Sequence, residues 1–275
     1  MINDKYHESV MVREVLENLH INKSSQYIDA TLGTGGHSLE IIKAGGEVLG
    51  IEADPKMLAI AKKRVPGGNF ILGNFIGIDK IAKENDFNKV SGILFDLGVT
   101  NLHLTGDDRG FSFGSSNLES GLDMRLNPEV QGVTAADLLN GLREDQLISL
   151  FETTMEMGNA RWLARRIFLE KPTTIGGLLK ICRELKSKSS LNPATLPFLA
   201  VRIAVNSELD NLRDVLPKAF ELLKPGGKLI VISFHSGEDR IAKEFAKNRL
   251  ILPGAGEIRR NPRARSAKLR IYEKI

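Results

Sequence analysis

The chain has 275 residues, of which 42% are hydrophobic, enough for one large domain or two smaller ones with buried cores. The net charge of +4, from 38 Lys and Arg against 34 Asp and Glu, is too close to balance to indicate a partner by itself. A single cysteine, Cys182, excludes an internal disulfide and a thiolate metal site. With no signal peptide and no apolar run that could span a bilayer, we expect a cytoplasmic protein that does not act in a membrane.

Short apolar runs and stretches of helical periodicity alternate in the first hundred residues. An amphipathic helix is predicted at residues 9–19. Strands are predicted at residues 27–29, 48–52, 70–72 and 92–96, with helices at 38–44 and 55–64 between them. This alternation is typical of a parallel sheet with helices on both faces.

The pattern changes from about Leu104, where a Gly, Ser and Asn-rich stretch leads into a region of helical periodicity without a convincing strand. Helices are predicted after a cap at Thr134 and at residues 159–169 and 174–185. Alternation resumes with a helical region at 200–223, a strand at 228–234 and a last strand at about 267–272, which we expect to close the sheet by a hairpin. The prediction is one discontinuous α/β domain, residues 1–103 and 196–275, interrupted by a helical domain at 104–195.

A glycine-rich loop follows the first predicted strand and reads Asp29-Ala30-Thr31-Leu32-Gly33-Thr34-Gly35-Gly36-His37. Such a turn lets backbone approach a ligand closely and directs a helix N-terminus at it, although many such turns are only tight connections. Glu52 at the end of the second strand strengthens the signal, because a carboxylate there can accept both hydroxyls of a ribose. A nucleoside-containing cofactor is the expected ligand.

The details of the loop favour S-adenosyl-L-methionine over a dinucleotide. The last two glycines are adjacent, unlike the spacing that seats a pyrophosphate, and Asp29 would repel phosphate but attract a cationic sulfonium amino acid. Phe75, after the third strand, could stack on adenine or belong to the core. The fold prediction is therefore a Rossmann-like sheet of the class I methyltransferase type, with Asp29, Gly33 and Glu52 among the cofactor-binding residues.

Asp96 ends the fourth predicted strand, where open α/β sheets bind ligands. An aromatic amine such as that of cytosine is a poor nucleophile, and a carboxylate that accepts its hydrogen bond can direct the nitrogen lone pair at a methyl group. Asp96 is the candidate catalytic residue; binding the methionine amino group and capping the next segment are the alternatives. The five histidines lack metal-ligand spacing, so no metal is expected.

Two segments are rich in basic residues, 161–188 and 259–270. Local positive charge of this kind attracts polyphosphates such as RNA through counterion release. An ordinary solvated surface is the alternative.

Distinctive motifs follow one another along the chain: Gly33 with Gly35-Gly36-His37, Asp96-Leu97-Gly98-Val99, Arg109-Gly110-Phe111-Ser112-Phe113, Leu122-Asp123-Met124-Arg125, Arg202-Ile203-Ala204-Val205-Asn206-Ser207-Glu208, Ile232-Ser233-Phe234-His235-Ser236 and Asn261-Pro262-Arg263-Ala264-Arg265-Ser266. In these motifs and their order, the chain resembles over nearly its whole length the bacterial small-subunit rRNA cytosine-N4 methyltransferases of the RsmH or MraW type.

The resemblance implies methylation of the exocyclic amine of a decoding-centre cytosine in 16S rRNA, within the small ribosomal subunit, and a substrate-recognition role for the helical insert. Carried over by position, the family's cofactor contacts fall on Gly35, Gly36, His37, Glu52, Phe75, Asp96 and His103. Glu52 stands where the family usually has Asp, and His103 where it usually has Gln.

We predict that the base is received by Arg109, Phe113 and Arg125 and oriented by Arg202, Asn206 and His235, with buried hydrogen-bonding or packing roles as the alternative. The chain departs from the family pattern at residues 100–102, 114–121 and 192–197, at the insert and its edges. A different RNA target, a small-molecule methyltransferase and an RNA-binding assembly factor are the other functions to weigh.

Overall fold

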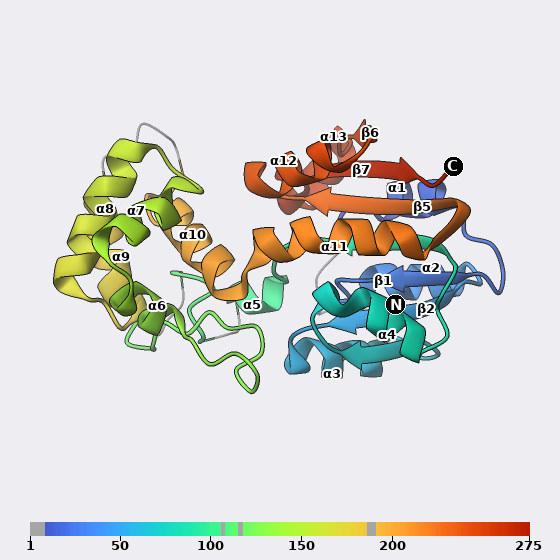
Figure 1. Ribbon diagram of the computed structural model, residues 1–275, viewed down its shortest axis with the longest axis horizontal. Coiled ribbons are helices and arrows are strands. Elements are labelled where there is room, and N and C mark those ends of the chain that lie inside the picture. Colours follow the sequence, from blue (N-terminus) through green and yellow to red (C-terminus); the bar gives the residue numbers. More distant parts are fainter. Residues whose placement is uncertain (1–8, 106–107, 115–117, 186–190) are drawn as a thin grey trace. The chain divides into compact units, whose positions relative to one another are not determined.

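The structure, a computed structural model, describes residues 9–105, 108–114, 118–185 and 191–275 (Figure 1). The chain divides into two compact units, one formed by residues 1–100 with 209–275 and the other by residues 101–208. The first boundary lies close to the predicted one. The second lies after Glu208 rather than at 195/196, since helix α10 (Thr195–Asn206) packs with α6 (Ala135–Gly141) and α7 (Glu144–Glu152).

A seven-stranded sheet forms the first unit, with the order β3-β2-β1-β4-β5-β7-β6. The first five strands are parallel, and β7 runs antiparallel between β5 and β6. The strand bounds are β1 (Gln26–Asp29), β2 (Glu47–Glu52), β3 (Asn69–Leu72), β4 (Val90–Asp96), β5 (Leu223–Ser233), β6 (Arg249–Ile251) and β7 (Lys268–Glu273). This mixed sheet and the helical insert confirm the predicted Rossmann-like α/β methyltransferase fold.

One detail of the sheet prediction is wrong. The strand predicted at 267–272 does not form the edge, because β6 pairs with its far side. β6 has three residues, and Leu250 in its centre is 44% exposed, so it carries neither the length nor the burial pattern by which a strand is recognised in sequence.

Helices cover both faces of the sheet. Neighbouring strand residues alternate between two hydrophobic cores, so that Ile93 and Phe95 face one core and Leu94 the other. The first core is completed by α4 (Ile78–Glu84), α11 (Glu208–Leu222) and α12 (Ser236–Phe245), and the second by α1 (Val12–Leu19), α2 (Gly36–Lys43) and α3 (Pro55–Arg64). The remaining elements of this unit are η1 (Phe75–Gly77), α13 (Ala255–Arg260) and η2 (Pro262–Ser266).

Among the residues that the structure describes, the regular secondary structure of the second unit is helical, apart from one isolated bridge between Gly121 and Thr174. It contains α5 (Asn101–Thr105), α6, α7, α8 (Met157–Glu170), α9 (Ile175–Arg183) and α10. Thr134 caps α6 through a capping box with Asp137, as its sequence position predicts. The helical region predicted at 200–223 is two helices, which separate at Ser207, where φ is 50°.

None of the helices among the described residues is both long enough and apolar enough for a membrane span.

Candidate functional site

The glycine loop turns sharply between β1 and α2. Gly33 and Gly35 have φ values of +53° and +81°, in the left-handed region that favours glycine. A Cβ atom on Gly35 would lie 2.7 Å from Cγ2 of Val65, too close for any side chain. The loop therefore needs glycine at this point for both backbone and steric reasons, and it places the N-terminus of α2 at the carboxyl edge of the sheet.

Replacing Gly35 with Ala should lower both the melting temperature and the affinity for S-adenosylhomocysteine, because the new methyl group must displace Val65 or the loop itself. Gly67→Ala is the matched control: its φ of +88° gives similar backbone strain, but nothing lies within 4 Å of the added Cβ. Thermal unfolding and calorimetric titration of both variants separate the two causes. Equal losses of affinity would show that steric fit of the loop is unimportant.

Glu52 connects the loops that follow β1 and β2. Its Oε2 accepts a hydrogen bond from the backbone N–H of Gly33 at 2.7 Å, and its Oε1 accepts one from the N–H of Asp54 at 2.8 Å. Burial raises the pKa of Glu52 to about 7. Each carboxylate oxygen retains a second lone pair, so the group can still accept the hydroxyls of a ribose.

Asp29 lies beneath the loop and is only 1% exposed. Its Oδ2 accepts a hydrogen bond from the Ser38 hydroxyl at 2.7 Å, and its Oδ1 accepts one from the N–H of Thr31. Burial also raises the pKa of Asp29. The carboxylate thus supports the turn from within, and its direct contact with a sulfonium amino acid stays a prediction.

Asp96 ends β4 beside β1, and its backbone N–H donates to the Thr31 hydroxyl at 2.6 Å. Its Oδ2 lies 3.3 Å from Nε2 of His37, whose side chain is 5% exposed. The other oxygen, Oδ1, is buried and makes no hydrogen bond to the part of the chain that the structure describes. A buried acceptor oxygen at this edge suits a ligand that donates a hydrogen bond.

Two further residues of the predicted cofactor site have different surroundings. Phe75 is half-buried and packs edge-to-face against Phe95 of the sheet core, with the ring centroids 5.6 Å apart. His103 lies on α5 in the helical unit, is 2% exposed, and packs 5.0 Å from the ring of Phe111. Stacking of Phe75 on adenine and contact of His103 with the cofactor both stay predictions.

Arg109 and Arg125, expected at the substrate, also bind their own chain. The Arg109 guanidinium donates to the carbonyls of Arg125 and Leu126 at 3.0 and 2.9 Å and lies over the ring of Phe111. Arg125 pairs with Asp123 through two hydrogen bonds, of 2.7 and 2.8 Å. These contacts match the buried hydrogen-bonding alternative, and they fold the segment before α6.

Three more of the predicted substrate residues also contact their own unit: Asn206, Arg202 and Phe113. The Asn206 amide donates to the carbonyl of Met124 at 2.9 Å and accepts from the N–H of Leu126 at 3.1 Å. Arg202 pairs with Glu208 through two hydrogen bonds, of 2.9 and 2.8 Å. The ring of Phe113 is half-buried and lies 5.2 Å from that of Phe198. Binding of substrate by these residues stays a prediction.

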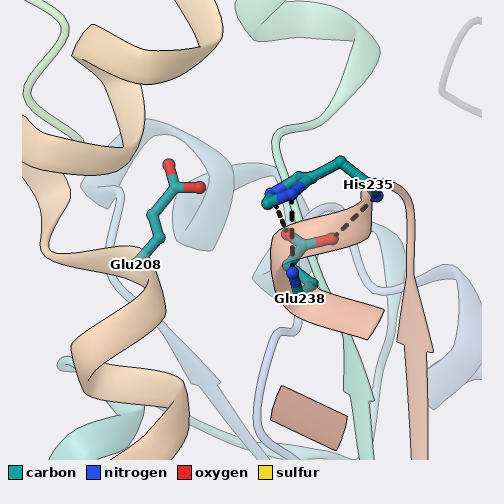
Figure 2. Close-up of side chains that lie close together, drawn as sticks. All are labelled: Glu208, His235 and Glu238. Atoms are coloured by element: carbon teal, nitrogen blue, oxygen red, sulfur yellow. Dashed lines mark hydrogen bonds and ion pairs between the residues drawn. The ribbon is translucent and has the colours of Figure 1, made fainter. Parts of the chain in front are cut away.

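His235 caps α12 in the sheet unit and is drawn with Glu238 in Figure 2. Its Nε2 lies 3.2 Å from Oε1 of Glu238, whose Oε2 accepts from the N–H of Phe234 at 2.8 Å. Glu208, also drawn in Figure 2, belongs to the helical unit, where it pairs with Arg202. A structural role for His235 at the start of α12 is therefore visible, while a role toward substrate stays a prediction.

The basic segment at 259–270 divides into buried and exposed parts. Arg263 donates to the carbonyl of Val99 at 2.9 Å, and Lys268 and Arg270 both pair with Asp239. The exposed members are Arg259, Arg260 and Arg265. In the other basic segment, Arg161 and Arg165 of α8 are exposed, and Arg165 pairs with Glu144.

The structure brings one part of the predicted site together at the carboxyl ends of β1, β2 and β4. This group consists of Asp29, Gly33, Gly35, Gly36, His37, Glu52 and Asp96. All seven were named as candidate site residues from the sequence, but the support from the Thr31 and Ser38 hydroxyls was missed, because a hydroxyl in a turn gives no signal of its partner. Oδ1 of Asp96 and both ring nitrogens of His37 are buried without a hydrogen bond to the described part of the chain. Together with the acceptor Glu52, Oδ1 of Asp96 fits a ligand that carries ribose hydroxyls and amine donors.

Comparison with known proteins agrees with this arrangement. Residues 4–250 match the family described as the MraW methylase family. Curated relatives named ribosomal RNA small subunit methyltransferase H include those of Dehalococcoides mccartyi, 37% identical over 98% of this chain and 86% of the relative, and Bacteroides fragilis, 36% identical over 98% and 97%. The relative of that name from Thermotoga neapolitana is 39% identical over 98% of this chain and 96% of its own length. The chain belongs to the MraW methylase family.

Proposed function

We propose that this protein transfers the methyl group of S-adenosyl-L-methionine to the exocyclic N4 amine of a decoding-centre cytosine in 16S rRNA of the small ribosomal subunit. The observation that carries the proposal is the position of Asp96 at the sheet edge that also holds the glycine loop and Glu52. Its Oδ1 is buried and can accept a hydrogen bond from a ligand. The names of the curated relatives supply the substrate class.

Each residue around the loop binds a different part of the cofactor. Glu52 accepts the ribose hydroxyls, the backbone at Gly33 and Gly35 allows close approach, and Phe75 stacks on adenine. When bound, the cofactor supplies an electrophilic methyl group on a positively charged sulfur. Asp29, beneath the loop, holds the turn through the Ser38 hydroxyl and the N–H of Thr31.

Asp96 acts on the acceptor amine. Its Oδ1 accepts a hydrogen bond from the N4 amine, which localises the nitrogen lone pair and directs it at the methyl carbon. As the N–C bond forms, the bond between the methyl carbon and sulfur breaks, which leaves S-adenosylhomocysteine, and one hydrogen of the amine leaves as a proton. If Asp96 instead binds the methionine amino group, its loss weakens cofactor binding and leaves kcat at saturating cofactor nearly unchanged.

The RNA is bound through phosphate contacts and received as a single splayed-out base. The exposed Arg259, Arg260 and Arg265 supply positive charge on the sheet unit, and Arg161 supplies it on the helical unit. A small-molecule methyltransferase would not need these exposed arginines, so loss of binding to small subunits after their neutralisation would argue against that alternative.

The test is methyl transfer from isotopically labelled cofactor to small subunits purified from a strain that lacks the modification, followed by nucleoside analysis. We expect label in N4-methylated cytidine with the wild-type chain and none with Asp96→Ala. Label in another nucleoside would show a different RNA target. The absence of label from all nucleosides, in a chain that binds S-adenosylhomocysteine, would favour an assembly factor and contradict the proposal.

Cofactor affinity should increase between about pH 6 and about pH 8, because the pKa of Glu52 is raised to about 7 by burial. The unliganded carboxyl is partly protonated in this range, whereas ribose hydroxyls donate to the carboxylate form and release the proton on binding. Calorimetry of S-adenosylhomocysteine in two buffers of different ionisation enthalpy measures this release. Glu52→Gln is the control and should bind more weakly; an unchanged pH dependence in this variant would contradict the assignment.

A further inference from the structure

His37, the second residue of α2, places a buried imidazole directly against Asp96. The ring is 5% exposed, and its Nε2 makes an ion-pair contact of 3.3 Å with Oδ2 of Asp96. Neither ring nitrogen meets hydrogen-bond geometry with a residue in the described part of the chain. Separate parts of the glycine loop fix the positions of His37 and Asp96. Gly35 and Gly36 begin the helix that carries His37, and the Thr31 hydroxyl holds the backbone of Asp96.

The charged groups that face His37 come from four elements. Three of these are the carboxyl groups of Asp96 on β4, Asp29 on β1 and Glu257 on α13. The fourth, Arg64 on α3, contacts the glycine loop at Thr34 rather than His37 itself. Burial by itself would lower the pKa of His37, but the Asp96 carboxylate 3.3 Å away, aided by Asp29 and Glu257, raises it above the ordinary value. The geometry and the surrounding charge therefore favour an imidazolium paired with a carboxylate.

We propose that His37 is a positioning residue for Asp96: the imidazolium holds Oδ2 of the ionised carboxylate and leaves Oδ1 as the oxygen that accepts the hydrogen bond from the substrate amine. This inference rests on the proposed function. It assigns the two oxygens of one carboxylate to different partners, which fixes the direction from which the amine approaches.

The proton that the amine loses on methylation does not go to His37. His37 already carries its proton in this arrangement, so it does not take up the one released on methylation. Its contribution is to orient the Asp96 carboxylate, so that Oδ1 is left to accept the hydrogen bond from the amine.

Nuclear magnetic resonance of protein carrying ¹⁵N-labelled histidine tests the pair without any activity assay. The His37 signal, identified by its loss in His37→Gln, should titrate above the ordinary histidine value of 6.5 in the wild type. In Asp96→Asn, with its fold verified by circular dichroism, the pKa should fall below that value because burial then acts without the partner charge. The same His37 pKa in both proteins would overturn the inference, as would a wild-type value below 6.5.

Kinetics distinguish positioning from cofactor contact alone. With small subunits as substrate and saturating cofactor, His37→Phe should lower kcat by about 10²-fold, and His37→Gln, which keeps an N–H donor, should recover part of that loss. If His37 acts only by contacting the cofactor, KM for the cofactor will rise while kcat at saturation stays the same. A wild-type chain that is inactive on small subunits defeats the proposed function, whereas the magnetic resonance titration still reports on the pair.

Discussion

Replacing Asp96 with Asn should lower kcat for methyl transfer by about 10² to 10⁴-fold at saturating cofactor. Asparagine has nearly the same shape, but its amide is a weaker hydrogen-bond acceptor than a carboxylate and cannot hold the negative charge that faces His37. Because the amine of cytosine is a poor nucleophile, loss of this acceptor should affect the chemical step more than binding. Single-turnover measurements with labelled cofactor and small subunits give the rate of that step.

The matched control is Asp79→Asn, an exposed carboxylate in the first turn of α4, which should leave kcat unchanged. The same experiment separates the two roles of Asp96. If Asp96 only binds the amino group of the cofactor, S-adenosylhomocysteine will bind more weakly, and kcat at saturation will stay within about twofold of wild type. That outcome would remove Asp96 from the chemical step.

The largest effect on stability is expected from Asp239→Ala, which should lower the free energy of unfolding by about 3 to 5 kcal/mol. Asp239 on α12 accepts hydrogen bonds from Arg270 at 2.9 Å and from Lys268 at 2.7 Å, both on β7. Arg270 is 6% exposed, and although Asn248 accepts a further hydrogen bond from it at 2.7 Å, removal of Asp239 leaves its charge buried without a carboxylate. The pair therefore stabilises the contact between α12 and the sheet.

Urea unfolding at neutral pH measures this loss, and Asp210→Ala provides the control. The side chain of Asp210 is 79% exposed and pairs with Arg213 on the surface of α11, so the change should cost less than about 0.5 kcal/mol. A loss below about 1 kcal/mol for Asp239→Ala would contradict the structural assignment.

The pH dependence of the Asp239 variant provides an independent check. Burial alone would raise the pKa of Asp239, but the hydrogen bonds from Lys268 and Arg270 lower it overall. A carboxylate with a lowered pKa contributes stability that is complete above its ordinary value of 3.8 and is lost as the pH falls through the folded value. The difference between wild type and Asp239→Ala should therefore decrease in strong acid and stay constant near neutrality.

The alternation of elements could be predicted because each carries a local signal. Asp54 followed by Pro55 marks the start of α3, and the Asp54 side chain accepts from the N–H of Lys56 at 2.7 Å, as a helix cap should. The short strand β6 and the boundary after α10 depend instead on tertiary contacts. Nothing in the sequence near residue 195 shows that α10 packs on α6 and α7.

The site was predictable to a similar extent. The glycine loop, Glu52 and Asp96 each follow a strand, and the ends of parallel strands meet at one edge. The pairing of His37 with Asp96 could not be predicted, because it depends on the strand order that makes β1 and β4 neighbours and on the register between them. The internal contacts of Arg109, Arg125 and Asn206 were also hidden, because an arginine or asparagine that binds backbone has the same sequence signal as one that binds RNA.

The claim that this edge of the sheet binds S-adenosyl-L-methionine is tested most directly by calorimetric titration of the unmodified chain with S-adenosylhomocysteine, with NAD as the comparison. We predict one-to-one binding of S-adenosylhomocysteine, no heat with NAD, and a weaker interaction in Gly35→Ala than in Gly67→Ala. Binding of NAD, or binding of S-adenosylhomocysteine that neither Gly35→Ala nor Glu52→Gln weakens, would contradict it.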